Sequence, residues 1–500
     1  MRVKKIYVGA ATAVLAGAII AACGGGGGSD SFDVMQGVVI QNASIVNTRD
    51  GSILPATSIV LDGGKITRIT PSHANVGGTA IAVDGSGKFL IPGLLDMHTH
   101  YFDNPTDQPQ TAALLVANGI TGIREMRGSS DLVQAAQQQN AARAAGTLDV
   151  PEILVIPGDI IGLTAVPAST SAAAAIQEVD KQKAYGAGFI KTIRANRDAT
   201  LAFLAEAKNQ GMYVAGHLSQ SVGARESAAA GWKAIEHLGA GLTILLDCSA
   251  NEDSIRAAVV AAGTNNPFYQ PILDSYSDAK CQAVAQTFAA NGTWNTPTLL
   301  KLRTSLVAND PAYLNDPNLI YVSRATRSAW AAAAQAFAAN NDATLMATKL
   351  AYFNKEQTLP RLLKQNGARL MAGSDTSSVP NWVIPGFSLH QEYKMLVAGG
   401  LTPLDVLQMT TLNGAQFMNR ESSTGTVDEG KNADLVLLDA NPIADVANLD
   451  KISAVFLRGK YLPKAALDRL KSDVAAFYAS QSVQQSAQVS GAAHVPAHVD

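Results

Sequence analysis

The sequence lacks a strong charge of either sign, because 38 Lys and Arg residues nearly balance 41 Asp and Glu residues for a net charge of −3. This balance excludes the basic field that binding to nucleic acid or to an anionic membrane surface requires. A Gly-x-Ser-x-Gly elbow is absent, and no Gly-x-Gly-x-x-Gly motif opens a strand–helix unit. The sequence therefore indicates neither a serine-nucleophile hydrolase nor a dinucleotide-binding enzyme.

Cysteine is scarce, with three residues in 500, and the first of them follows a targeting segment. Residues 1–22 combine three basic residues with a run of apolar and small residues, as in a secretory signal peptide. Cys23 after small residues resembles the lipobox of bacterial lipoproteins, so we expect Cys23 to be lipidated and 23–36 to be a Gly-rich tether. Gly24 at the next position favours the periplasmic face of the outer membrane. The alternative is an ordinary signal peptide with an incidental cysteine.

The other two cysteines, Cys248 and Cys281, lie close together in the sequence. Export would place them in a compartment where disulfides form. A disulfide between them and two free buried thiols are both compatible with the sequence.

Segments rich in β-formers lie near both ends of the chain. Residues 37–86 contain short apolar runs with turn signals such as Asp62-Gly63-Gly64, and 425–465 contain two further runs. Neither segment is large enough for a core of its own. We therefore expect one small composite β-sandwich domain built from both ends.

Between these segments, residues 87–424 alternate short apolar strands with alanine-rich helical stretches. Eight such units in sequence predict an α/β fold, a (β/α)₈ barrel of the TIM type, with insertions at about 245–365. Residues 466–500 are expected to contain a C-terminal helix, which starts at 463 and ends at 480, and a disordered tail from 481 onwards. The candidate strands span 89–98, 120–126, 153–156, 189–193, 213–217, 234–237, 295–299 and 370–375.

The strongest local signal is the pair His98 and His100, which ends an apolar strand. Strand periodicity directs both imidazoles to one face, where they can chelate a divalent metal ion. A His-x-His pair alone is a weak motif, since such histidines are more often simply solvated or hydrogen-bonded.

Four further residues of ligand type occur at or in other predicted strands. His217 and His237 end two of them, Asp375 ends the last, and Lys191 lies inside an apolar strand where an ammonium is costly to bury. The carboxyl ends of barrel strands form the usual active-site face. The combined pattern therefore predicts a metal centre at that face.

This pattern resembles the amidohydrolase superfamily, in its prolidase-like and imidazolonepropionase-related branch. The similarity covers residues 37–465 and includes KFLIPGLLDMHTH, GSDTS, NADLVLLDANP and VFLRGKYL. It implies two divalent ions, zinc first, with Mn, Co, Fe or Ni as alternatives. It further implies a CO₂-derived carbamate on Lys191 that bridges the ions. The implied ligands are His98, His100 and Asp375 for one ion and His217 and His237 for the other.

Each implied role has a plainer alternative. The Lys191 ammonium could reach the barrel mouth or pair with a carboxylate such as Glu125. His217 and His237 could support other ligands instead of binding metal. Asp375 could be a helix N-cap.

The resemblance implies hydrolysis of an amide C–N bond in a dipeptide or N-acyl amino acid, by a metal-activated water with Asp375 as general base and acid. Arg194, more weakly Arg124, and His390 are candidate substrate contacts. The alternatives are hydrolysis of a cyclic amide, lactone or carbamate, a mononuclear deaminase, and a metal-binding lipoprotein without turnover. The expected partner is a small-molecule or dipeptide substrate, with no nucleic acid, membrane contact only through the lipid, and a homo-oligomer allowed.

Overall fold

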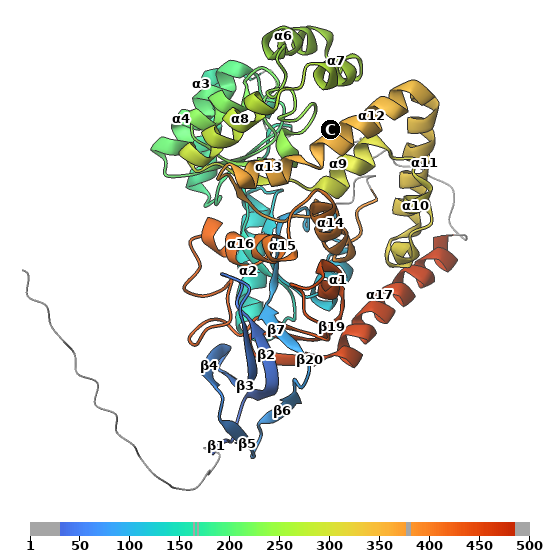
Figure 1. The fold of residues 1–500 in the computed structure, drawn as a ribbon. Helices are drawn as coiled ribbons and strands as arrows, with labels where there is room; N and C mark the ends of the chain where they lie inside the picture. The colour runs from blue at the N-terminus through green and yellow to red at the C-terminus, as the bar shows by residue number, and fades with distance from the viewer. Residues whose placement is uncertain (1–30, 164–165, 168–169, 377–381, 486–500) are drawn as a thin grey trace, which may run out of the picture.

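A computed structural model describes residues 31–163, 166–167, 170–376 and 382–485 of the chain. A β-sheet region lies at one end of the molecule, and a larger region of strands and surrounding helices lies at the other (Figure 1). The predicted signal peptide, 1–22, and the lipidation site Cys23 lie outside the described residues, as does the predicted tail from 486 onwards.

The β region is an eight-stranded sheet whose strands come from both ends of the chain. Its order is β20-β19-β18-β7-β2-β3-β4, and β6 pairs with β2. β1 (Ser31–Val34) and β5 (His73–Val76) form a separate parallel pair, so the predicted tether already ends in a strand at Ser31. The strands of the large sheet are β2 (Val38–Val46), β3 (Ile53–Asp62), β4 (Lys65–Thr70), β6 (Ile81–Asp84), β7 (Phe89–Pro92), β18 (Leu435–Leu438), β19 (Ile452–Leu457) and β20 (Lys460–Pro463).

The segment predicted as one strand, 89–98, is two strands that belong to different sheets. β7 pairs with β18 and β2 in the β region, whereas β8 (Leu94–Thr99) pairs with β9 (Ile120–Glu125) in the larger region. Gly93 separates them at a close approach, because a Cβ atom there would lie 2.0 Å from Thr121 Oγ1. Glycine is therefore required where the chain passes from one sheet to the other.

The larger region contains parallel strands at all eight predicted places, and its α/β class is as predicted. Two parallel sheets have the orders β10-β9-β8 and β12-β11-β13-β14-β15-β16-β17. The remaining strands are β10 (Glu152–Val155), β11 (Ile161–Gly162), β12 (Val166–Pro167), β13 (Ile190–Thr192), β14 (Val214–Gly216), β15 (Trp232–Glu236), β16 (Trp294–Thr296) and β17 (Arg369–Leu370).

Main-chain hydrogen bonds also join the two parallel sheets beyond the named strands. On one side, the Gly188 amide donates to the Ile156 carbonyl at 2.9 Å, which links the β10 and β13 segments. On the other side, the Met97 amide donates to the Ala372 carbonyl and the Asp375 amide to the His98 carbonyl, both at 2.9 Å. The residues after β17 therefore lie directly beside β8.

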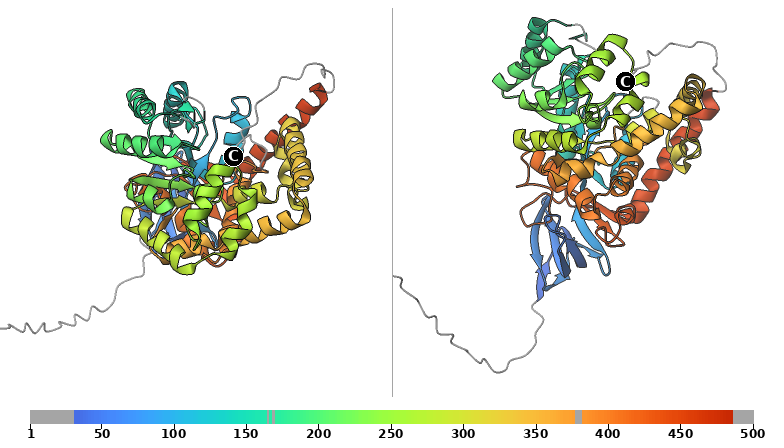
Figure 2. Two further views of the ribbon diagram at one scale, coloured as in Figure 1. Left: turned by 90° about the horizontal axis from the view of Figure 1, so that it is seen from above. Right: turned by 45° about the horizontal axis from the view of Figure 1, so that its top comes forward.

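Helices follow the parallel strands and cover them on the outside (Figure 2). The region predicted as insertion, 245–365, also contains one strand and two helices of the repeating strand–helix units, namely β16, α8 and α13. The added helices are therefore α6, α7 and α9–α12. The helices of the repeating units are α1 (Gln108–Ala117), α2 (Ser130–Ala144), α3 (Ala172–Ala184), α4 (Arg197–Asn209), α5 (Ala224–Ala229), α8 (Asp278–Asn291), α13 (Leu359–Gln365), α14 (Phe387–Ala398), α15 (Pro403–Met409) and α16 (Leu412–Phe417). The added helices are α6 (Glu252–Ala262), α7 (Tyr269–Asp274), α9 (Leu299–Leu306), α10 (Pro311–Leu314), α11 (Arg324–Asn340) and α12 (Ala343–Glu356), with short 3₁₀ turns η1 (His237–Gly239), η2 (Asn266–Phe268), η3 (Pro317–Tyr321) and η4 (Val446–Asp450).

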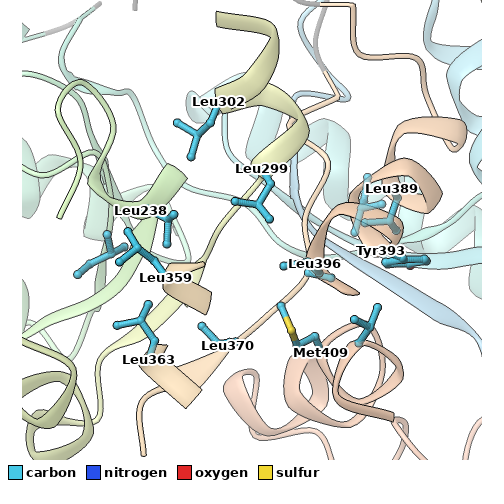
Figure 3. Packing of buried hydrophobic residues seen from close by; sticks show 14 of the residues in the cluster. Leu238, Leu299, Leu302, Leu359, Leu363, Leu370, Leu389, Tyr393, Leu396 and Met409 are labelled. Atoms are coloured by element: carbon cyan, nitrogen blue, oxygen red, sulfur yellow. The ribbon is translucent and has the colours of Figure 1, made fainter. Parts of the chain in front are cut away.

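One large apolar cluster runs between the parallel strands and these helices. Burial of each leucine stabilises the fold by roughly 1.5–3 kcal/mol relative to exposure, so this cluster is the main source of stability. Part of it appears in Figure 3, where the labelled side chains are Leu238, Leu299, Leu302, Leu359, Leu363, Leu370, Leu389, Tyr393, Leu396 and Met409.

Cys248 and Cys281 form a disulfide, with their Cα atoms 4.5 Å apart. Of the two alternatives that the sequence left open, the structure contains the disulfide and not two free thiols. The bond ties the segment between η1 and α6 to α8, and both residues are buried.

The terminal helix, α17 (Lys464–Gln485), continues past the predicted end at 480, so 481–485 are helical. It packs along α1 and η3, beside the added helices (Figure 1). Among the described residues, no helix combines the length and the apolar character needed to cross a membrane.

A buried ion pair joins the β region to the helical layer. Arg143, in the last turn of α2, donates to Asp434, just before β18, at 2.6 Å, and the two side chains are only 5% and 8% exposed. Asp434 also accepts a hydrogen bond from the Arg458 amide at 2.9 Å. The Asp434 carboxylate, just before β18, therefore links this strand to the end of β19 and to α2.

We predict that Asp434→Ala lowers the free energy of unfolding by about 3–5 kcal/mol, because it leaves the Arg143 guanidinium buried without its counter-charge. Urea denaturation followed by circular dichroism measures the loss. Asp149→Ala is the matched control: its pair with Lys460 is 40% and 57% exposed, and its removal costs less than about 1 kcal/mol. Equal losses in the two variants would contradict a structural role for the buried pair.

Candidate metal centre

His98, His100 and Asp375 meet at the end of β8. His98 is fully buried inside the strand, and His100 follows the last strand residue, Thr99. Asp375 Oδ1 lies 3.1 Å from His98 Nε2 and 3.3 Å from His100 Nε2. One ligand-type atom from each of the three residues lies within 4.8 Å of the others. This spacing suits coordination of one divalent ion.

His217 and His237 follow β14 and β15 and complete a row of three imidazoles with His98. The ring centroid of His237 is 4.5 Å from that of His98 and 4.8 Å from that of His217. Lys191 is fully buried in β13; burial is the main cause that lowers the pKa of His98 and His237, and the Lys191 charge adds to it. The structure therefore brings all six residues of the predicted centre together at the carboxyl ends of the parallel strands.

Left-handed backbone conformations place two of these side chains. His237 and Leu238 have φ angles of 53° and 52°, directly after β15. Asp375 has a φ of 56°, a conformation that Asp tolerates better than most residues. Such strained positions persist where the surrounding structure fixes them, and here the Asp375 amide donates to the His98 carbonyl.

Beneath the histidines lies a buried charge pair that the sequence did not identify. Glu236 Oε2 lies 2.8 Å from His98 Nδ1, and Glu236 Oε1 accepts from Arg124 at 2.7 Å; all three side chains are fully buried. Burial alone would raise the pKa of Glu236, but Arg124 and His98 lower it to about 2. The carboxylate thus stays ionised and orients the imidazole, as carboxylates behind metal-ligating histidines do.

Asp375 is also kept ionised. Burial raises its pKa, but Lys301 and the neighbouring histidines overcome that effect and lower the pKa well below its usual range. Lys301 Nζ, from α9, lies 3.3 Å from Asp375 Oδ2. Since Oδ1 faces the two histidines, the two oxygens of one carboxylate have different neighbours.

Two of the donor rings, His98 and His237, fit a divalent ion in their protonation state, whereas at His100 the Asp103 and Asp375 carboxylates overcome the effect of burial and raise the pKa to about 10. Burial lowers the pKa of His98 and, further, of His237, so both rings are neutral and can donate a lone pair. His98 Nε2 is buried and makes no hydrogen bond of acceptable geometry with any described residue. Neutral imidazoles beside an ionised carboxylate form a typical ligand set for zinc and related ions.

Two of the three predicted substrate contacts, His390 and Arg124, have other partners. Arg194, two residues after β13, is exposed at the same end of the strands as Lys191. His390 instead lies on α14 with Nε2 2.9 Å from the Asn118 carbonyl and Nδ1 2.9 Å from Asp450. Asn118 precedes β9, so His390 is near the amino ends of the strands and cannot face the centre. Arg124, the weaker candidate, is fully buried against Glu236.

Short stretches of the chain match curated enzymes of known activity. The chain is 28% identical over 213 residues to adenine deaminase 3 of Rhizobium meliloti (strain 1021), covering 40% of this chain and 36% of that protein. It is 35% identical over 94 residues to a dihydroorotase of Carboxydothermus hydrogenoformans, covering 18% and 21%. The matched stretches thus span little more than a third of these relatives at most, and their activities do not transfer directly.

Solved structures match over most of the chain and share its fold. Bottromycin amidohydrolase superposes with a TM-score of 0.68 at 20% identity over 88% of this chain and 90% of that one. A putative prolidase from Bifidobacterium longum gives 0.60 at 22% identity over 88% and 99%. A Xaa-Pro dipeptidase with bound methionine gives 0.60 at 18% identity over 86% and 100%. The larger region is therefore an α/β fold of the TIM-barrel type.

The family assignment rests on a match over most of the chain. The model of the amidohydrolase family matches residues 89–462, a span that begins at β7 and ends in β20. Members of this family are metal-dependent hydrolases of C–N bonds, which agrees with the cluster of imidazoles and carboxylate at the strand ends. This chain belongs to the amidohydrolase family.

Proposed function

We propose that this amidohydrolase cleaves the amide bond of a dipeptide or an N-acyl amino acid. The observation that carries the proposal is the meeting of His98, His100 and Asp375 beside the His217, His237 and Lys191 side chains at one end of the parallel strands. A site of this composition can activate water without a protein nucleophile.

In this proposal the centre holds two divalent ions, zinc or, alternatively, Mn, Co, Fe or Ni. His98, His100 and Asp375 would hold one ion, and His217 and His237 would hold the other. Lys191 would react with CO₂ to form a carbamate, which would convert a costly buried ammonium into a further ligand. Support comes from the full burial of Lys191 and its nearness to His98 and His237.

The bound ions would acidify water and polarise the scissile carbonyl. Asp375 is the proton carrier: its ionised carboxylate accepts a proton from the attacking water and delivers it to the leaving nitrogen. Lys301 holds Oδ2 at 3.3 Å and so fixes the direction of the carboxylate. Glu236 and Arg124 keep the His98 ring in one orientation beneath it.

The substrate class is supported by solved structures that cover 86–88% of this chain and include a putative prolidase and a Xaa-Pro dipeptidase. A second candidate is deamination of a purine, which the partial likeness to adenine deaminases favours. Release of ammonia from adenine, with no cleavage of dipeptides, would select the second candidate.

We also propose that the eight parallel strands close into a barrel. The hydrogen bonds from Gly188 to Ile156 and from Met97 to Ala372, each 2.9 Å, support closure because they join β10 to the segment before β13 and β8 to the residues after β17. Closure would fix the relative positions of ligands drawn from strands far apart in the sequence.

The location of the protein is part of the proposal. It is exported and lipid-anchored at Cys23 on the periplasmic face of the outer membrane; the Cys248–Cys281 disulfide supports an oxidising compartment. We predict that cells incorporate labelled palmitate into the protein and that Cys23→Ser abolishes this labelling. Unchanged labelling in the variant would contradict the anchor.

We predict that chelators abolish hydrolysis, that Zn, Mn or Co restores it, and that Asp375→Asn lowers kcat by about 10²–10⁴-fold, because the amide cannot accept a proton. Turnover is measured on a panel of dipeptides and N-acyl amino acids, with metal content measured in parallel. Asp131→Asn, an exposed substitution on α2, is the control and keeps full activity. Full turnover in a metal-free preparation, or in a metal-loaded Asp375→Asn variant, would refute the mechanism.

A second prediction separates the number of bound ions from their affinity. The wild type is expected to bind about two ions per chain, and Lys191→Met about one, because the bridging ligand is lost. Glu236→Gln is expected to keep about two ions but to bind them about 10–100-fold more weakly, as the His98 ring loses its anionic partner. Metal analysis and competition with a chromophoric chelator measure both quantities.

The control is Glu392→Gln, which changes another fully buried glutamate whose carboxylate accepts from the Leu300 amide at 2.8 Å. Burial raises the pKa of Glu392 to about 8, so it is already neutral at pH 7 and the substitution preserves its charge. This variant should match the wild type in both measurements. Two ions in Lys191→Met, or unchanged affinity in Glu236→Gln, would exclude the assigned roles.

A further inference from the structure

A pocket opens beside the candidate metal centre and shares His100 with it. Its walls come from the segment that runs from β8 into α1, the added segment from η3 to α11, the terminal helix α17, and Thr376, Val383 and Pro385 before α14. A substrate whose scissile bond lies at the metal centre can therefore extend a neighbouring group into this pocket.

Two carboxylates, Asp103 and Asp107, line the pocket, and among the described lining residues no lysine or arginine accompanies them. Asp103 is compensated from behind by Arg127, whose NH1 lies 3.1 Å away. Asp107 receives only neutral donors, the Asn104 amide at 2.7 Å and the Tyr478 hydroxyl. Asp107 therefore brings to the pocket a carboxylate that no lysine or arginine among the described lining residues compensates.

The position of Asp107 is not explained by the helix that it precedes. It occupies the N-cap of α1, where an aspartate commonly accepts from the first helical amides, but its side chain makes no capping hydrogen bond. Burial raises its pKa. The carboxylate thus does not cap the helix and is partly desolvated. A cation in the pocket would offset the free-energy cost of this desolvation.

Aromatic side chains supply much of the remaining wall. Tyr321 precedes α11, Trp330 lies within it, and Tyr478 comes from α17. Neighbouring rings hold two of them in place, since Tyr321 stacks on Phe387 at 5.0 Å and Trp330 meets Trp382 at 5.4 Å between centroids. Ring faces beside a carboxylate attract ammonium and guanidinium groups.

We propose that this pocket binds a cationic group of the substrate, an ammonium or a guanidinium, with Asp107 as its counter-charge and Tyr321, Trp330 and Tyr478 around it. The inference rests on the proposed function, because the cation belongs to the molecule whose amide bond lies at the metal centre. Two sources fit the same chemistry: the free α-ammonium of a dipeptide and the basic side chain of a lysine or arginine residue.

The terminal helix is therefore part of the specificity pocket. Val474 and Tyr478 of α17 pack against Leu114 of α1 in one buried cluster, which brings the Tyr478 hydroxyl to Asp107. Tyr478 is a positioning residue, since its hydrogen bond holds the carboxylate towards the pocket. Tyr478→Phe keeps the packing and removes only this bond.

The test uses the metal-loaded full-length enzyme and matched substrates. Dipeptides with arginine are compared with their citrulline counterparts, and free α-amines with N-acetylated forms. We predict that the cationic member of one pair has a KM about tenfold lower than its neutral counterpart. The Asp107→Asn variant should lose this preference, while kcat and the KM of neutral substrates change little. The pair that shows the effect identifies the source of the cation. Tyr478→Phe should lose part of the preference, and Asp131→Asn none.

Binding of arginine amide and citrulline amide by calorimetry gives a readout that needs no turnover. If dipeptides are cleaved without preference for a cation in either pair, the pocket assignment is overturned while the hydrolase assignment stands. If no dipeptide or N-acyl amino acid is cleaved but arginine amide binds more tightly than citrulline amide through Asp107, the pocket stands and the proposed substrate class fails. Equal binding of the two amides, with no preference in either substrate pair, would overturn the pocket assignment.

Discussion

The centre depends on one buried carboxylate, Glu236, which lies between a guanidinium and an imidazole. Arg124 supplies the charge that keeps Glu236 ionised without solvent, and Glu236 in turn fixes the ring of His98. Arg124 also donates to the Met97 carbonyl, within the strand that carries His98. Strands β8 and β9 of one parallel sheet and β15 of the other are thereby coupled through charge at the point where a metal ion would sit.

Much of the ligand set could be predicted from the sequence because histidines at strand ends are rare and the strands are short apolar runs. His98 and His100 follow the two-residue period of a strand. Glu236 could not be found in this way, since it is adjacent to His237 and alternation should send the two to opposite faces. The left-handed turn at His237 and Leu238 breaks the alternation and lets both act at one centre. A φ angle of this kind leaves no clear mark in a single sequence.

The fold was predictable at the level of element type and less so at the boundaries. The run 89–98 is interrupted by Pro92-Gly93, but this turn signal alone does not indicate that the two halves pair with different sheets. His390 was misplaced for a related reason. Its nearness to Asp375 in sequence suggested the mouth, but α14 runs back along the outside of the strands and carries His390 to Asn118 at their other end.

The β sheet joins strands from the beginning and the end of the chain, because β7 pairs with β18 across more than three hundred residues. A nascent polypeptide that stops before β18 leaves β7 with an unpaired edge, and α1 without the helix that covers it. Native contacts so distant in sequence make folding slow and late. Translation must therefore be almost complete before the molecule can reach its final form, and partial chains remain open to chaperones for longer than those of a protein built from local contacts.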